Sequence, residues 1–220
     1  MLGNKEQDQF NLIKQYFEGL MTPVQEKQIE LLPGLYREWN EQINVISRKD
    51  MDDFLIHHVL HSMALRKFMK FEAGTKCLDA GTGGGFPGIP LAILNPDCHF
   101  TLVDARRKKI KVVEAVVESL GLQNVKAQHA RLEDLEQKFH LITGRAVTNM
   151  GAFYRLVAPL FESKNRSRTQ RNGLIYWKGT DYLKEVSDVG LKCDIYKLSA
   201  IFKEPYFDEK FILYFFRRTK

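Results

Sequence analysis

The stretch LDAGTGGGFPGIPLAI, Leu78 to Ile93, decides the fold of this chain. It places four glycines within five positions, 81–85, directly after a short apolar run. Glycine adopts positive φ and leaves room for a ligand against the backbone. An apolar helical pattern follows at 88–94. The stretch therefore predicts a strand–turn–helix unit whose exposed N–H groups suit a nucleotide-like ligand.

Strands and helices alternate around this unit. Apolar runs predict five strands, at residues 76–80, 99–104, 124–128, 139–143 and 173–177, with helical patterns between them at 88–94, 107–120 and 150–161. Such alternation predicts a parallel sheet with helices on both faces. Two further strands, at 192–202 and 210–218, flank a Glu-Pro-Tyr-Phe-Asp turn and predict an antiparallel hairpin at the end of the chain.

The first 70 residues carry a helical pattern instead. Apolar residues recur at helical spacing in 9–20, and Thr22-Pro23 marks the start of a second helix, with a kink expected at Pro33-Gly34. Asp50 is expected to cap a third helix. We predict an N-terminal helical segment, residues 1–72, packed on an α/β unit of residues 73–220 to form one compact body.

The residues beside the glycines indicate the kind of nucleoside. Asp104 ends the next strand about 20 residues on, where a carboxylate accepts both ribose hydroxyls. The dinucleotide fingerprint G-x-G-x-x-G is broken, because Phe86 stands at its third glycine. Asp79 would repel a diphosphate but suits a cationic amino-acid portion or a sulfonium, as in S-adenosylmethionine (SAM) enzymes. A Walker P-loop is excluded, because no Gly-Lys-Ser/Thr follows.

The extended glycine stretch resembles that of the bacterial RsmG/GidB family, the methyltransferases of guanine N7 in 16S ribosomal RNA. Further similar segments follow in the family's order: WNEQINVISRKD (39–50), HHVLHS (57–62), ARLED (130–134), ITGRAV (142–147) and YWKG (176–179). The sequence departs from the family at His61, where aspartate is usual, and at Val45-Ile46, where Leu-Thr is usual.

The resemblance implies an α/β fold, a Rossmann-like class I SAM methyltransferase. Its sheet would be mostly parallel and seven-stranded, with an antiparallel C-terminal hairpin, and residues 73–220 would form the methyltransferase domain. SAM is the implied cofactor. The implied cofactor-binding residues are Gly81, Gly83, Phe86, Asp104, Leu132, Glu133 and Arg145. Leu132 and Glu133 are expected along the adenine and Asp104 at the ribose.

Three assignments have alternatives. Arg145 suits the methionine carboxylate or an RNA phosphate, and equally a salt bridge to Asp79. Phe86 lines the cofactor site or is an ordinary core aromatic. Lys178, at the end of the fifth predicted strand, contacts guanine O6 or a phosphate, or lies in solvent.

The net charge of +6 and the pI of about 9.1 permit a polyanionic partner. A dense basic cluster from Arg107 to Lys111 directly follows Asp104. The RNA-contact candidates are Arg48, Arg107, Lys108 and Lys178. We expect 16S rRNA or the small ribosomal subunit as the partner, and no DNA. A solvated helix face, a methyltransferase of proteins or small molecules, and a non-catalytic RNA-binding module remain alternatives.

Other features narrow the class of protein. His57, His58 and His61 lack the HExxH pattern, and no metal site is predicted. Guanine N7 has an in-plane lone pair and no proton to lose, so no general base is assigned. Three separated cysteines predict a reducing compartment. The polar N-terminus and the lack of a long apolar run predict no signal peptide and no membrane span, and hence a cytoplasmic protein.

Overall fold

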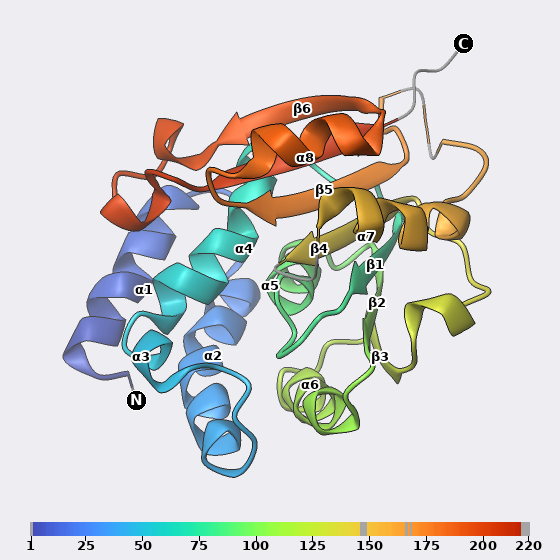
Figure 1. Cartoon of the computed structure of the whole chain (residues 1–220). Coiled ribbons are helices and arrows are strands. Elements are labelled where there is room, and N and C mark those ends of the chain that lie inside the picture. Colours follow the sequence, from blue (N-terminus) through green and yellow to red (C-terminus); the bar gives the residue numbers. More distant parts are fainter. Residues whose placement is uncertain (1, 146–148, 166, 168, 217–220) are drawn as a thin grey trace.

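The computed structural model describes residues 2–145, 149–165, 167 and 169–216. A seven-stranded sheet forms its centre (Figure 1). The strands are β1 Lys76–Ala80, β2 His99–Asp104, β3 Val125–His129, β4 Leu141–Arg145, β5 Gly173–Lys178, β6 Lys192–Lys197 and β7 Phe211–Phe216. Their order is β3-β2-β1-β4-β5-β7-β6, and β7 runs antiparallel to both of its neighbours. The predicted fold class is confirmed.

β1 lies where the order of successive strands switches from one side of the sheet to the other. It pairs in parallel with β2 on one side and with β4 on the other. The register sets Ala80 opposite Val103 and Asp79 opposite Thr143. The carboxyl ends of these strands therefore meet at one edge of the sheet. In open α/β sheets such a reversal is where ligands bind.

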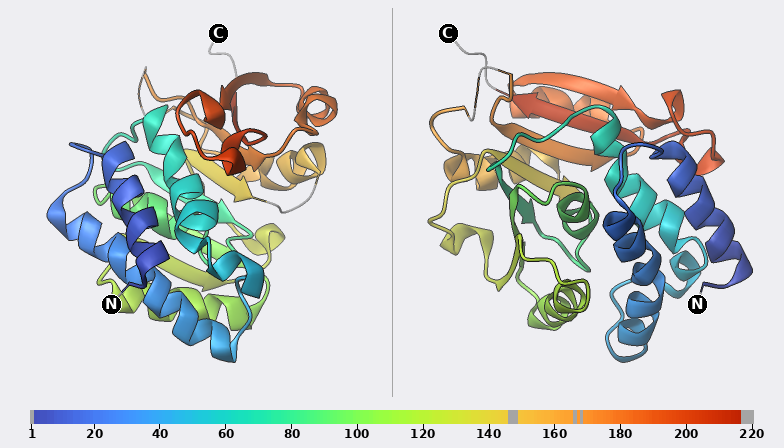
Figure 2. Two further views of the ribbon diagram at one scale, coloured as in Figure 1. Left: turned by 90° about the vertical axis from the view of Figure 1, so that its left-hand side faces the viewer. Right: turned by 180° about the vertical axis from the view of Figure 1, so that it is seen from behind.

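Helices cover both faces of the sheet (Figures 1 and 2). They are α1 Asn4–Tyr16, α2 Pro23–Gln42, α3 Arg48–Met51, the π-helical segment η1 Leu55–Leu60, α4 His61–Met63, α5 Gly88–Leu94, α6 Arg107–Ser119, α7 Met150–Val157 and α8 Tyr182–Val189. Short 3₁₀ turns are η2 Ala64–Lys67, η3 Leu132–Asp134, η4 Ala158–Leu160, η5 Leu198–Ala200 and η6 Pro205–Phe207. One apolar core joins α1, α2, η1, α5 and α6 to the sheet, and a second lies under α7 on the other face.

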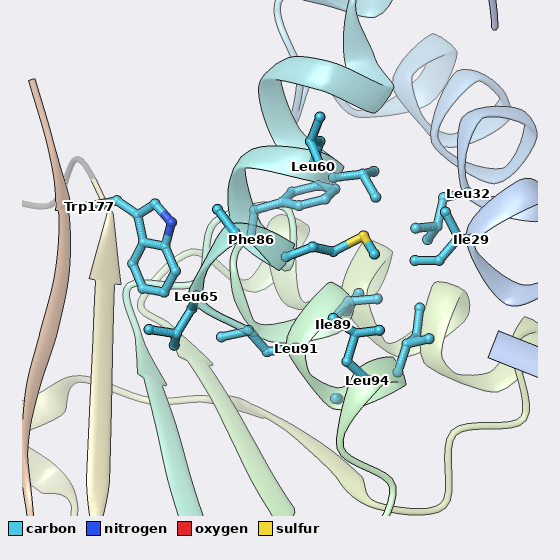
Figure 3. Close-up of a cluster of buried hydrophobic side chains, with 14 of the residues drawn as sticks. Ile29, Leu32, Leu60, Leu65, Phe86, Ile89, Leu91, Leu94 and Trp177 are labelled. Atoms are coloured by element: carbon cyan, nitrogen blue, oxygen red, sulfur yellow. The ribbon is translucent and has the colours of Figure 1, made fainter. Parts of the chain in front are cut away.

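The N-terminal helices pack directly on the α/β unit (Figure 3). The apolar face of α2 contributes Ile29 and Leu32, both fully buried. They belong to the same buried cluster as Leu60 and Ile89. The indole N–H of Trp177, at the end of β5, donates to the carbonyl of His61 at 2.8 Å. These contacts hold the segment with the three histidines over the carboxyl edge of the sheet. The domain boundary at 72/73 stays a prediction.

Some local predictions were wrong. Asp50 does not cap the third helix: Ser47 does, because its hydroxyl accepts from the backbone N–H of Asp50. The helix α2 continues across Pro33, as one helix with an internal proline was expected to do, and the kink at Pro33-Gly34 stays a prediction. Helix α8 was not predicted.

The C-terminal hairpin is shorter than predicted. Residues 198–210 form a connection with the two turns η5 and η6, and η6 falls on the predicted Glu-Pro-Tyr-Phe-Asp turn. Residues 217–218 of the predicted second strand lie outside the described residues. In the part of the chain that the structure describes, no helix combines the length and apolar character needed to cross a bilayer.

Candidate active site

The glycine turn follows β1 and leads into α5. Gly81, Gly83 and Gly85 have φ of 73°, 61° and 98°, values that favour glycine. A Cβ on Gly85 would lie 2.5 Å from the Cδ1 of Ile89. Positive φ therefore disfavours a side chain at all three positions, and at Gly85 the following helix α5 also blocks one.

Asp79 fixes this turn from beneath. Its carboxylate accepts hydrogen bonds from the hydroxyls of Thr82 (2.5 Å) and Thr143 (2.9 Å) and from the N–H of Gly88 (2.9 Å). Burial raises the pKa of Asp79, and these donors oppose that rise. Asp79 is 1% exposed, so it orients the turn from within the protein.

Asp104 holds the turn from the side. One carboxylate oxygen accepts from the N–H of Gly83 at 3.0 Å, and the other accepts from the N–H of Arg106 at 2.8 Å. A carboxylate offers about four acceptor positions, so capacity for further hydroxyl donors remains on Asp104. The predicted pairing of a glycine turn with the acid of the next strand is therefore present in the structure.

The N-terminal helices also reach the turn. The hydroxyl of Tyr36 donates to the carbonyl of Gly84, and Val45 lies beside the same glycine. Burial raises the pKa of Tyr36, so this hydroxyl keeps its proton. Position 45, one of the departures from the family pattern, thus contacts the glycine turn.

Phe86 is 4% exposed and belongs to the buried aromatic cluster. Its ring centroid lies 5.0 Å from that of Tyr36 and 5.3 Å from that of His58. The guanidinium of Arg145 lies over the same ring at 5.6 Å. Phe86 is therefore part of the core and also part of the surroundings of Arg145.

Arg145 ends β4 and turns toward the N-terminal helices. It donates to the carbonyl of His57 at 3.3 Å and to the Nδ1 of His58 at 3.0 Å. The alternative of a salt bridge to Asp79 is wrong for the described residues, because the carboxylate of Asp79 is taken up by the donors named above. Burial lowers the pKa of Arg145, and nearby tyrosines and carboxylates oppose that effect. Residues 146 and 147 of the ITGRAV motif lie outside the described part of the chain.

The remaining cofactor candidates lie at the end of β3. Leu132 and Glu133 form the short turn η3, with Leu132 partly buried and Glu133 exposed. Since β3 neighbours β2, this turn and Asp104 occupy the same edge of the sheet. The structure thus brings all seven predicted cofactor residues to the carboxyl ends of β1 to β4.

A cavity of about 630 Å³ opens over the ends of β4 and β5. Its lining residues are Asp50, His57, His58, His61, Arg145, Tyr176, Trp177, Lys178, Gly179, Asp181, Tyr206 and Lys210. Tyr206 comes from η6 and stacks on His57 with ring centroids 4.0 Å apart. Its hydroxyl lies 3.2 Å from the carbonyl of His57 and 3.0 Å from the Nδ1 of His61. Among the described residues, no group of three or more His, Cys, Asp or Glu side chains could hold a metal ion.

The sequence did not single out Tyr206, Lys210 or Asp181 as site residues. Nothing in the local pattern marks them, because they reach the cavity only through the connection after β6 and the turn after β5. Lys178, which was singled out, lies in the cavity wall with its ammonium 2.7 Å from the carboxylate of Glu185. Lys178 is therefore already paired with Glu185.

The basic candidates lie near the glycine turn. Arg107 and Lys108 are exposed in the first turn of α6, and a Cβ on Gly83 would lie 3.6 Å from the ammonium of Lys109. Arg48 is exposed at the start of α3, just after the segment that contacts Gly84. The polar stretch ESKNRSRTQRN, residues 162–172 before β5, is also basic, and its residues 166 and 168 lie outside the described residues.

Comparison with known proteins gives relatives over nearly the whole chain. A "Ribosomal RNA small subunit methyltransferase G" from Cytophaga hutchinsonii is 44% identical over 203 residues, covering 92% of this chain and 97% of the relative. One of the same name from Flavobacterium psychrophilum is 47% identical over 194 residues, covering 88% and 92%.

The fold has solved counterparts. A structure described as a SAM-dependent methyltransferase from Aquifex aeolicus matches with a TM-score of 0.57 at 12% identity, covering 83% of this chain and 97% of that one. The model of the family described as rRNA small subunit methyltransferase G matches residues 25–199. Fold, motif order and relatives agree, and the chain belongs to the rRNA small subunit methyltransferase G (GidB) family.

Proposed function

We propose that this protein transfers a methyl group from SAM to N7 of a guanine in 16S ribosomal RNA. Membership of the family and the matched relatives support the activity. The observation that carries the proposal is the edge of the sheet where the glycine turn, Asp104 and a separate cavity over β4 and β5 adjoin. Two adjoining sites are what a transfer between a cofactor and a large acceptor requires.

The residues at the ends of β1 to β3 fit an adenosyl group. Gly81 and Gly83 present backbone without side chains, an added Cβ on Gly83 would meet the ammonium of Lys109 at 3.6 Å, and Asp104 keeps acceptor capacity for ribose hydroxyls. Leu132 and Glu133 would flank the adenine, and the backbone after β3 would contact the ring nitrogens. These roles are part of the proposal.

The methionine end of the cofactor would then face β4. There Arg145 offers a guanidinium that no carboxylate of the described residues pairs with, and Phe86 supports it from below. A carboxylate is the partner that such a fork suits best. SAM, when bound, supplies a methyl group on a cationic sulfur.

No proton transfer is required for attack by guanine N7, since its lone pair lies in the ring plane and carries no hydrogen. The protein's contribution is to hold the acceptor base and the methyl donor in line and to exclude water. The cavity over β4 and β5 is the acceptor pocket in this proposal. The histidines in it are then binding and positioning groups instead of bases.

The start of α6 supports an RNA partner. Arg106 to Lys109 and Lys111 are basic, no acidic residue lies in the first turn, and the side chain of the N-cap residue Arg106 makes no capping hydrogen bond, so the carboxylate of Asp104, which accepts from the Arg106 N–H, is the one acidic group bonded to the backbone there among the described residues. Positive side chains at a helix N-terminus are unfavourable, because the helix dipole is positive there. A bound phosphate backbone would relieve this repulsion. Since 16S rRNA is the proposed substrate, we expect the protein to act in the cytoplasm, on the rRNA or the small subunit.

The test is methylation of rRNA by the purified protein. Small-subunit RNA from a strain lacking this methylation is incubated with SAM labelled in the methyl group. We expect label in 16S rRNA and 7-methylguanosine among its nucleosides by mass spectrometry. Bound SAM without label in RNA or in assembled subunits would refute the RNA assignment, and failure to bind SAM would refute the cofactor assignment.

A further inference from the structure

The acceptor pocket contains a carboxylate among cations. Asp50 lines it together with Arg145, Lys178 and Lys210. A phosphate would be repelled by Asp50, so this carboxylate does not serve the RNA backbone. A carboxylate can accept from the N–H donors of a base or from a ribose 2′-hydroxyl, and only the base donors distinguish one base from another.

Asp50 is held in one orientation. The hydroxyl of Ser47 donates to one carboxylate oxygen at 2.8 Å, and Nδ1 of His57 lies 3.0 Å from the other. The hydrogen bond to His57 is the main cause that lowers the pKa of Asp50, so the group is ionised at neutral pH. The side chain is 42% exposed, and each oxygen keeps room for one more donor.

His58 lies beside the same carboxylate. Its Nδ1 must accept, because the guanidinium of Arg145 can only donate. Burial lowers the pKa of His58 to about 3, so the ring is neutral and carries its proton on Nε2. That atom has no hydrogen-bond partner among the described residues and lies 3.9 Å from the carboxylate of Asp50. His58 therefore lies between Asp50 and Arg145, hydrogen-bonded to Arg145 and within 3.9 Å of Asp50, at the proposed cofactor site.

The hydrogen-bond donors of the four RNA bases indicate which base a carboxylate would bind. Guanine alone among the four RNA bases presents two adjacent N–H donors on one edge, at N1 and at the 2-amino group, which match the two oxygens of a carboxylate. That edge faces away from N7. A base held there leaves N7 free to face β4.

Resting on the proposed function, we propose that Asp50 is a specificity-determining residue that accepts hydrogen bonds from N1–H and the 2-amino group of the target guanine. Asp181 is the other carboxylate in the cavity wall. It is exposed, and its side chain caps no helix. The fixed orientation of Asp50 therefore favours Asp50 as the group that recognises guanine.

The test uses 16S rRNA joined from two fragments, with guanosine or inosine at the methylated position. Inosine keeps N7, O6 and N1–H but lacks the 2-amino group. We expect the wild-type protein to prefer guanosine by about 10-fold in kcat/KM, the effect of one hydrogen bond. Asp50→Asn should bring this ratio to about one or below, because its amide presents a donor where an acceptor is needed. Loss of local structure alone would lower both rates equally and leave the ratio unchanged.

Asp52→Asn is the matched control, since Asp52 follows the same short helix but does not line the cavity. It should keep the wild-type ratio. A wild-type ratio near one, an unchanged ratio in Asp50→Asn, or loss of the ratio in Asp181→Asn instead would each overturn the assignment. If the wild-type protein methylates neither RNA, the proposed function itself fails. Calorimetry with SAM confirms that Asp50→Asn has kept its cofactor site.

Discussion

Two carboxylates beside the glycine turn have different environments. Asp79 is 1% exposed and accepts from three protein donors, whereas Asp104 lies at the open end of β2 with acceptor capacity to spare. The first is a structural group that shapes the turn. The second is available to a ligand. Residue type and position do not separate the two roles, because both residues are acids at strand positions beside the turn. Burial and hydrogen bonding separate them.

Substitution should separate the two roles. Asp104→Asn should weaken SAM binding by about 10-fold or more, because a hydrogen bond to a charged acceptor contributes about 1.5–3 kcal/mol. Asp79→Asn should lower the free energy of unfolding by about 3 kcal/mol, because its amide would face the hydroxyl and N–H donors. Calorimetry measures the first effect and urea unfolding the second. Equal SAM affinity in Asp104→Asn and wild type would contradict the ribose role.

At the scale of an element, α6 combines two tasks. Its apolar side, with Ile110, Val113 and Val116, packs into the core. Its first turn presents cations toward the glycine turn, and Lys111 lies over the ring of Trp39 at 5.8 Å. Packing of the apolar side holds the helix in position. The basic side chains of its first turn are therefore not needed for anchoring and are available to a polyanion.

Charge reversal in α6 tests this separation. Arg107→Glu with Lys108→Glu should lower kcat/KM for 16S rRNA by about 10- to 100-fold and reduce the salt dependence, since each lost phosphate contact removes about 0.9 from the logarithmic salt slope. SAM affinity should stay unchanged. The control is Lys138→Glu with Lys164→Glu, exposed lysines that precede β4 and β5 at the opposite edge. An equal loss in the control would refute a local RNA contact. Activity of the charge-reversed protein on a small substrate would support the alternative, a methyltransferase of proteins or small molecules.

At the scale of the whole molecule, three regions of the chain line the cavity over β4 and β5. The N-terminal segment provides Asp50 and the histidines, the parallel sheet provides Arg145, and the connection between β6 and β7 provides Tyr206. His61 is 5% exposed within this junction. Burial lowers the pKa of His58 to about 3 and that of His61 well below its ordinary value. The assembled fold therefore requires both rings to be neutral.

This requirement predicts acid sensitivity. The unfolded histidines take up protons below about pH 6.5, while the folded ones stay neutral, so stability present above that pH is lost as the pH falls. Between pH 6.5 and 5 each histidine contributes at most about 2 kcal/mol to this loss. His58→Gln should therefore lose less stability than the wild type over this range in urea unfolding. His99→Gln, at an exposed position, should follow the wild type; a His58→Gln curve parallel to the wild type would contradict the assignment.

The sequence by itself determined the parallel core, the glycine turn with its two acids, and the family. These features are local, since apolar periodicity and glycine conformation depend on neighbouring residues, and strand ends of a parallel sheet necessarily share an edge. It also located Arg145 and the basic start of α6, though not their partners.

Only the tertiary structure decided what those side chains meet. Asp50 was expected to cap a helix and instead lines a pocket with His58 and Tyr206. Helix α8 was missed although Asp181 and Gly190 bound it, and the connection after β6 was predicted only around its Glu-Pro-Tyr-Phe-Asp turn. Residues 50, 145 and 206 are far apart in the chain, and packing of the N-terminal helices and the C-terminal connection on one sheet edge brings them together. Such contacts depend on the burial of whole faces, which no short stretch of sequence specifies.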